Sequence, residues 1–529
     1  MNTLPLVNRY KSAIYIFFLI LISFSFNYYY AFIGVLPVDS FSTFNAGADL
    51  LRGSIPFKDY WIIKGLVLDF IQAFFFKIFD ISWFSYALHA SFFNTIFALA
   101  SYFTFRTLGL NSWYSFFYSS LASILLYPTY GIPFTDHSAA IFCLISIYLL
   151  ILAIKTDKNS YWFFIPSFLF LAFFTKQTPT GYIGILIILV SILYLILSFR
   201  KRIIFFSFIG SIIPISFFLI YVLIYQIPIE NIIIQYFLFP VSLGETRLEW
   251  LFPFEAQRFF IRHKLLYLSL SVPIFLLFSE FLKIKKLRLN RDILIFFLLF
   301  GTLIIFISHQ LMTINGLYIF FLIPIFSGFS HLYSSSFKSE KILIRFFLIL
   351  SLISTIYYQQ KYINKRDTLL LRNVDLNIAL DAGVMSDKLK NLKWVTHHYP
   401  LNPEKEVKNL MESMEIIKKD NRKKMIVTDY QFLSVILSIN DNSAARIWWR
   451  HHLYPVKGNQ YFNYWKNFLI AKILSEKISV IYTVHPLEGE ENIFQDLITD
   501  NCYSKKKLNE ILTIQILEKC NEFISLKSN

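Results

Sequence analysis

Long apolar runs separated by short polar stretches recur from the N-terminus to about residue 358. A membrane-spanning helix needs about 20 mainly apolar residues. By that measure the pattern predicts about eleven spans. The predicted spans are 13–36, 84–105, 113–130, 136–154, 161–175, 181–199, 203–225, 265–282, 292–309, 316–333 and 341–358. A shorter apolar stretch at 66–79 carries Asp69, Gln72 and Lys77, so we expect a helix lying at the membrane interface.

The spanning pattern stops near residue 358, and the remaining residues have the composition of a soluble domain. Periodicity predicts helices at 404–419 and 461–476. It predicts strands at 424–428, 478–484 and 512–517. We therefore predict a polytopic α-helical membrane protein with a small C-terminal α/β domain. Its domains are a transmembrane domain at 1–358, whose first outer loop is about 37–83, and an extracytoplasmic domain at 359–529.

Basic residues cluster in alternate loops between the predicted spans. These residues are Arg106, Lys155, Lys158, Arg200, Lys201, Arg202, Lys283, Lys285, Lys286, Arg288, Arg291, Lys338 and Lys341. Cytoplasmic loops carry an excess of Lys and Arg, so we place these loops in the cytoplasm. With an odd number of spans, the residues from about Gln359 onward then lie outside. We expect a multi-pass protein of the plasma (inner) membrane, with its C-terminal domain outside the cytoplasm.

Composition agrees with membrane burial. Hydrophobic residues make up 56% of the chain and charged residues only 16%. The net charge of +16 is explained by the basic loops, which argues against a nucleic-acid partner. The sequence contains no Walker A, GxGxxG, HExxH or paired CxxC motif, which excludes the commonest nucleotide and zinc sites. Cys502 and Cys520 form either a disulfide or two free thiols if their region is extracytoplasmic.

The first outer loop carries the most informative residues. It contains Pro37–Ser40, Phe44–Gly53, Ile55–Trp61 and Lys64–Gly65. These segments resemble the first outer loop of the GT-C glycosyltransferases, in the bacterial branch related to protein mannosyltransferases and the lipid A aminoarabinose transferase. In that superfamily an acidic residue follows the first span, and Asp39 matches it. Many members have paired acids at this place, whereas here Ser40 follows Asp39.

Two further positions fit the resemblance. Phe173–Thr178 looks like the Thr-Lys-Gln edge of a later span in this branch. Asp136 stands at the outer start of a span, where such enzymes often place a second acid. The resemblance covers about residues 10–360 in layout. It implies a GT-C-like fold and transfer of a hexose or pentose from a polyprenyl-phosphate donor to a lipid, glycan or protein acceptor outside the cytoplasm.

This reaction needs a carboxylate that accepts the proton of an incoming hydroxyl, and cations where the phosphate leaves. Asp39 is the predicted base, and Asp136 is the second predicted catalytic acid. The phosphate candidates are Lys64, Lys176, Arg247 and Arg258, and the other predicted substrate-binding residues are Asp59, Tyr60, His137 and Gln177. The sequence indicates no cofactor. It leaves dependence on a divalent metal open, because no motif indicates a metal.

Each of these residues also has a structural alternative. Asp39 fits a solvated acid after a helix, Asp136 fits a helix N-cap, and Lys176 fits a snorkelling cation. Interfacial polar positions suit His137 and His309 better than ligand roles do, and a turn and an aromatic belt suit Asp59 and Tyr60.

Other functions also fit a polytopic protein. A polysaccharide ligase or polymerase usually carries its large outer loop between late spans. A transporter or flippase for lipid-linked sugars favours two related halves, and the sequence shows no such symmetry. A non-catalytic scaffold would not need acids that converge from separate loops.

Overall fold

The computed structural model describes residues 6–249, 255–282, 290–313, 318–440, 442–448, 453–485, 497–498 and 502–518. Its contacts divide the chain into two compact units. The membrane unit contains residues 1–31, 87–220 and 246–368, and the outer-loop unit contains residues 32–86, 221–245 and 369–529. The second unit thus joins the first predicted outer loop to the C-terminal domain in one compact body.

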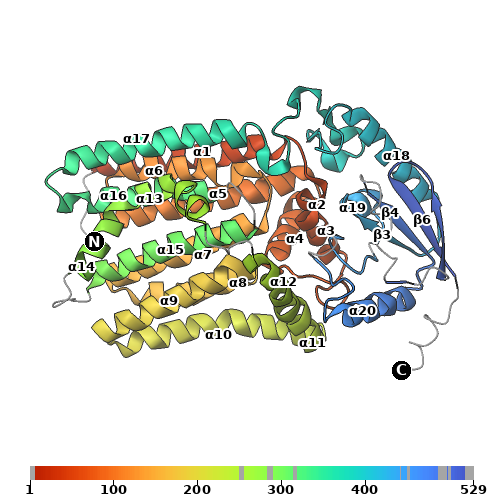
Figure 1. Cartoon of the computed structure of the whole chain (residues 1–529), viewed down its shortest axis with the longest axis horizontal. Coiled ribbons are helices and arrows are strands. Elements are labelled where there is room, and N and C mark those ends of the chain that lie inside the picture. Colours follow the sequence, from red (N-terminus) through yellow and green to blue (C-terminus); the bar gives the residue numbers. More distant parts are fainter. Residues whose placement is uncertain are drawn as a thin grey trace. The chain divides into compact units, whose positions relative to one another are not determined.

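The membrane unit consists of helices (Figure 1). They are α1 (Leu6–Ala31), α5 (Trp83–Leu108), α6 (Ser112–Leu125), α7 (Thr135–Thr156), α8 (Asn159–Phe173), α9 (Gln177–Leu197), α10 (Lys201–Ile224), α13 (Lys264–Ser269), α14 (Ser271–Phe281), α15 (Arg291–Thr313), α16 (Leu322–Tyr333) and α17 (Glu340–Tyr358). In the described part of the chain, seven helices are long and apolar enough to cross a membrane. The other predicted spans also form helices, most of them shorter, such as α6 with 14 residues. The prediction of a polytopic helical membrane protein is confirmed.

Helix α7 lies at the centre of the membrane unit. Its spanning window is 94% buried, whereas that of α10 is only 11% buried. Helices α8 and α9 pack against α7, and α15 packs against α9, as Figure 1 shows. Where α8 crosses α10, a Cβ at Gly210 would meet the Phe163 carbonyl oxygen at 1.9 Å, so only glycine fits there. Small residues at such crossings are typical of membrane helix packing.

Polar side chains connect helices inside the membrane unit. Asn27 donates to the Ser91 hydroxyl at 3.0 Å, and Asn94 donates to the carbonyl groups of Ser23 and Ser123 at 2.8 and 3.0 Å. Lys155 pairs with Asp292, and Arg291 pairs with Asp157, where α7 ends and α15 begins. Several residues of the predicted cytoplasmic loops therefore gather at one end of the bundle, while Lys283, Lys285, Lys286 and Arg288 lie outside the described residues.

The outer-loop unit contains short helices and two small sheets. Its helices are α2 (Pro37–Ser40), α3 (Ser42–Leu51), α4 (Val67–Phe79), α11 (Ile229–Ile232), α18 (Pro403–Lys419), α19 (Leu433–Leu437) and α20 (Phe462–Ser475), and α12 (Phe239–Glu249) begins in it. The predicted helix at 66–79 is thus found as α4. Helices α3 and α4 pack closely, since a Cβ at Gly47 would meet Gln72 Cγ at 2.8 Å.

The main sheet has the strand order β3-β4-β6-β5. Its strands are β3 (Lys424–Thr428), β4 (Val480–Val484), β6 (Leu512–Leu517) and β5 (Tyr503–Lys507), and β1 (Leu380–Asp381) pairs with β2 (Lys393–Trp394) elsewhere. Strands β3 and β4 are parallel, and the other pairs are antiparallel. With α18 and α20 this confirms the predicted small α/β domain. The boundary of the predicted domains at residue 358 stays a prediction.

Candidate active site

Two side chains of the membrane unit, Lys176 and His309, meet the carboxylate of Asp136. Asp136 lies in the first turn of α7 and is 3% exposed. Its Oδ1 accepts from Lys176 Nζ at 2.6 Å, and His309 Nε2 lies 3.1 Å from the same oxygen. Lys176 precedes α9, and His309 lies near the C-terminal end of α15. The ends of three helices thus hold one carboxylate between an ammonium group and an imidazole.

The local sequence explains where Lys176 sits. Helix α8 ends at Phe173 and α9 begins at Gln177, with Pro179 in the first turn. Proline lacks a backbone N–H and suits the first turn of a helix, so Pro179 favours a helix that begins at this place. Lys176 is the residue before α9, and its side chain is 21% exposed. The break therefore brings a cation to the helix ends where Asp136 lies.

Asp136 does not cap its helix. The N-cap of α7 is Phe134, with no side-chain hydrogen bond to the helix, and Asp136 is already helical. An acid in the first turn is still favoured by the helix dipole. Lys176 pairs with this buried carboxylate, so its ammonium group does more than snorkel to the solvent. The N-cap alternative for Asp136 is therefore wrong.

Arg247 belongs to the surroundings of this carboxylate. It is half-buried in the last turn of α12. Burial lowers the pKa of Arg247, and the negative charge of Asp136 acts in the opposite direction. Gln177 begins α9 beside Lys176 and is also half-buried. Arg258 is half-buried in the segment Gln257–Ile261, and its guanidinium makes no hydrogen bond or ion pair with the described residues.

His137 is packed as a core residue. It is fully buried, and its Nε2 lies 2.8 Å from the Thr129 hydroxyl. The rings of Tyr127, Tyr130 and Phe134 surround it. These contacts favour the structural role for His137. His309 differs, because its imidazole contacts the candidate acid Asp136 directly.

In the outer-loop unit, Asp39 lies on the one-turn helix α2. The turn is closed by the Ser40 hydroxyl, which accepts from the Leu36 N–H at 2.9 Å, and by the Asp39 N–H, which donates to the Leu36 carbonyl at 3.0 Å. Asp39 is half-buried. Ser40, which stands where many GT-C enzymes have a second acid, thus has a structural role. Its hydroxyl fixes the backbone turn on which Asp39 lies.

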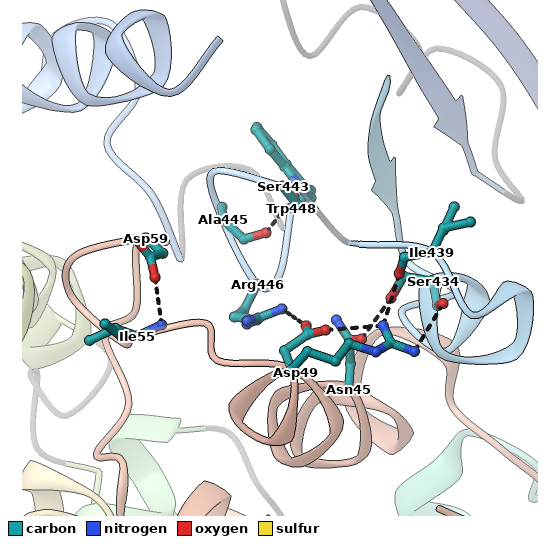
Figure 2. A network of polar contacts seen from close by, with 11 residues as sticks. Asn45, Asp49, Ile55, Asp59, Ser434, Ile439, Ser443, Ala445, Arg446 and Trp448 are labelled. Atoms are coloured by element: carbon teal, nitrogen blue, oxygen red, sulfur yellow. Dashed lines mark hydrogen bonds and ion pairs between the residues drawn. The ribbon is translucent and has the colours of Figure 1, made fainter. Parts of the chain in front are cut away.

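A buried ion pair ties the outer-loop helix α3 to the C-terminal segment 442–448. The Arg446 guanidinium pairs with Asp49, as Figure 2 shows. It also stacks over the Tyr60 ring, 3.6 Å from the ring centroid. Arg52, which pairs with Asp49 at 3.4 Å, also donates to the Ile439 carbonyl at 2.9 Å. Asp49 is 1% exposed and Arg446 is 7% exposed. These charges are therefore removed from water and held by each other.

A polar pocket lies beside this ion pair. Ser42, Lys64, Asp69 and Arg446 supply its polar lining, and Trp61 forms part of its wall. Lys64 donates to the Ser42 hydroxyl. Burial raises the pKa of the Asp69 carboxyl to about 7, against the opposing charges of Lys64 and Arg446. The pocket thus combines two cations with an acid that gains a proton near neutral pH.

Asp59 has a turn role and Tyr60 does not lie in an aromatic belt. The Asp59 carboxylate accepts from the Ile55 N–H at 2.7 Å, as Figure 2 shows. Tyr60 is 1% exposed, beneath the guanidinium of Arg446. The turn alternative therefore describes Asp59, and Tyr60 supports a buried cation.

The predicted site residues fall into two groups. Asp136, Lys176 and Arg247 lie together in the membrane unit. In the outer-loop unit, Lys64 and Arg446 line one pocket, and Tyr60 lies against Arg446. Sequence reasoning missed Asp49, Asp69 and Arg446 as members of the second group. Asp69 gave a signal, because it is an isolated acid in an apolar stretch. Within the described ranges, no three His, Cys, Asp or Glu side chains are placed to hold a metal ion.

No family model matches the chain, and no curated protein matches it. Among solved structures, it is similar to the crystal structure of ArnT from Cupriavidus metallidurans bound to undecaprenyl phosphate. The similarity covers 95% of this chain and 97% of that chain, with 10% identity and a TM-score of 0.45. A TM-score below 0.5 does not support a functional assignment, so the proposal that follows rests on the residues of this chain.

Proposed function

We propose that the chain is a glycosyltransferase that moves a sugar from a polyprenyl-phosphate donor to an acceptor outside the cytoplasm. The observation that carries this proposal is the cluster of Asp136, Lys176 and His309 at the helix ends of the membrane unit. Ionisable groups near membrane depth are costly, so they are retained for function more often than for stability. A cation at this depth is suited to a lipid phosphate, which stays at the interface while its tail remains in the bilayer.

The pairing with Asp136 leaves Lys176 able to bind phosphate. An ammonium group has three N–H donors, and the carboxylate of Asp136 takes one of them. Asp136 therefore fixes the position of Lys176 and leaves donors for phosphate oxygens. Arg247, which the charge of Asp136 also reaches, is the second candidate, because a guanidinium binds two phosphate oxygens at once. Cations at the leaving phosphate stabilise the charge that develops in the transition state.

Asp39 is the proposed general base. Its resemblance to the acid that follows the first span in GT-C enzymes supports this role, as does the short turn that presents a half-buried carboxylate. A base that removes the proton of the acceptor hydroxyl contributes roughly 10²–10⁴ in rate. We further propose that the protein resides in the plasma (inner) membrane and that residues 359–529 lie outside the cytoplasm, because the basic loops favour that orientation.

A test of the function must distinguish two activities. One is transfer of the sugar from its lipid phosphate, and the other is transport of the intact lipid-linked sugar across the membrane. Membranes that contain the native acceptor are incubated with undecaprenyl phosphate carrying a radiolabelled hexose or pentose. The proposal predicts that the wild-type protein releases undecaprenyl phosphate and labels the acceptor. Asp136→Asn should lower this release at least about tenfold, because Lys176 loses its charged partner. Asp80→Asn, an exposed acid at the end of α4, is the matched control and should keep full activity. Labelled lipid that crosses the membrane without losing its sugar would indicate a flippase instead.

A further inference from the structure

The pocket of the outer-loop unit contains an acid that the proposed mechanism does not use. Asp69 is 4% exposed and lines the pocket together with Ser42, Lys64 and Arg446. Its carboxylate accepts no hydrogen bond from the part of the chain that the structure describes. A buried polar group without a hydrogen-bond partner is unfavourable, so such a group in a pocket points to a ligand.

The neighbouring charges already have partners. Arg446 pairs with Asp49 and stacks on Tyr60, and Lys64 donates to Ser42. The pocket therefore offers an acceptor, Asp69, next to ammonium and guanidinium donors that are already held in place. A bare phosphate fits this arrangement poorly, because the Asp69 carboxylate would repel it when ionised. A hydroxyl group fits well, because it donates one hydrogen bond and accepts others.

We infer that this pocket binds the sugar unit of the lipid-linked donor, with Asp69 as the acceptor for a sugar hydroxyl. Lys64 donates to an oxygen of the same sugar, and Trp61 supplies an apolar wall. Asp69 is thereby a residue that selects sugar-linked over sugar-free lipid. This inference rests on the proposed function and deepens it, since it names the part of the donor that the pocket recognises.

Binding measurements on the full-length protein in lipid nanodiscs test this role. The probes are tritiated undecaprenyl phosphate and its glucose, mannose, galactose and arabinose derivatives. For the derivative that wild type binds most tightly, Asp69→Asn should raise the Kd roughly 10- to 100-fold, the effect of one charge-assisted hydrogen bond. The Kd of the same variant for undecaprenyl phosphate itself should stay within about twofold of the wild-type value. Asp80→Asn should change neither value, because Asp80 is exposed.

Three results would overturn the inference. Asp69→Asn could weaken both kinds of lipid equally, it could weaken neither, or wild type could bind no derivative more tightly than undecaprenyl phosphate. If the asparagine variant does not fold, Asp69→Ala gives the same comparison. Transfer is scored separately with the same lipids. A wild-type protein that shows Asp69-dependent sugar binding but no transfer would refute the glycosyltransferase and leave the sugar pocket standing.

Discussion

Glu406 shows what a buried carboxylate needs in this fold. It accepts from Trp394 Nε1 at 3.0 Å, from the Thr396 hydroxyl at 2.9 Å and from the Tyr430 hydroxyl at 2.7 Å. Asp136 is held in the same manner by Lys176 and His309. Asp69 differs, because it accepts no hydrogen bond from the described residues. At the scale of residues, the paired acids have a structural explanation, and Asp69 is the acid to which we assign a ligand.

The role of Lys176 can be measured by donor kinetics. Lys176→Ala should lower kcat/KM for the lipid donor, by an amount that corresponds to roughly 1–3 kcal/mol of activation free energy. The KM for the acceptor should stay unchanged. Lys176→Arg should recover part of the loss, because the charge remains while its geometry changes. Lys158→Ala replaces an exposed lysine at the start of α8 and serves as the control. An alanine variant that raises only the acceptor KM would place Lys176 in the acceptor groove.

The protonation of Asp69 predicts a pH-dependent stability difference. Its folded-state pKa is raised from 3.8 to about 7, so between these values the folded protein binds more protons than the unfolded chain. Stability therefore falls as pH rises through this window, and Asp69→Asn removes the fall. The variant should unfold at nearly the wild-type temperature at pH 4 and at a higher temperature at pH 8. If the unfolding temperatures of the variant and wild type differ by the same amount at pH 4 and pH 8, Asp69 does not titrate in this window.

At the scale of elements, apolar runs determined most of the fold. Helices lie at each predicted span, and β3 and β6 match their predicted residues. Strand β5 was missed because its residues, Tyr503–Lys507, are mainly lysine and lack an alternating pattern. Charged residues are typical of an edge strand, and β5 lies at the edge of its sheet. The candidate site was predictable where residues lie near span ends, as Asp136 and Lys176 do.

Contacts distant in sequence could not be predicted. Nothing in the residues around Arg446 indicates that it pairs with Asp49, which precedes it by hundreds of positions in the chain. The same holds for His309, which reaches Asp136 only because α15 ends beside the start of α7. Charge pairing of this kind depends on packing, which periodicity does not specify.

The ion pair of α3 with segment 442–448 should govern the stability of the outer-loop unit. Arg446→Ala removes the buried cation that pairs with the buried Asp49 carboxylate, so we expect destabilisation of roughly 3–5 kcal/mol. Replacing both residues by Met should cost less than the single change, because Asp49 is then no longer a buried charge without Arg446. Arg52 loses Asp49 in this double variant, but its side chain is partly exposed and still donates to the Ile439 carbonyl. Thermal unfolding and limited proteolysis measure the effect. Lys405→Ala breaks an exposed pair with Glu510 and should leave the unfolding temperature unchanged. If the double variant is as unstable as Arg446→Ala, the ion pair is not the cause.

At the scale of the whole molecule, cysteine labelling tests the orientation of the protein in the membrane. The basic loops and the odd number of predicted spans predict that the C-terminal domain lies outside. In a variant whose three native cysteines are replaced by serine, a cysteine introduced at the exposed Ser475 should react with a membrane-impermeant reagent in intact spheroplasts. A cysteine at the exposed Ser339, in a predicted cytoplasmic loop, should react only after lysis. Protection of Ser475→Cys with labelling of Ser339→Cys would reverse the topology.

The most direct test of the central claim is transfer by Asp39→Asn. Wild type, Asp39→Asn and the control Asp80→Asn are expressed to equal levels in membranes and given undecaprenyl phosphate with a radiolabelled sugar. We expect that wild type and control transfer the sugar, and that Asp39→Asn retains less than about a tenth of that rate because the acceptor hydroxyl has lost its base. Transfer by Asp39→Asn above a tenth of the wild-type rate, with insertion intact, would contradict the assignment of Asp39 as the base.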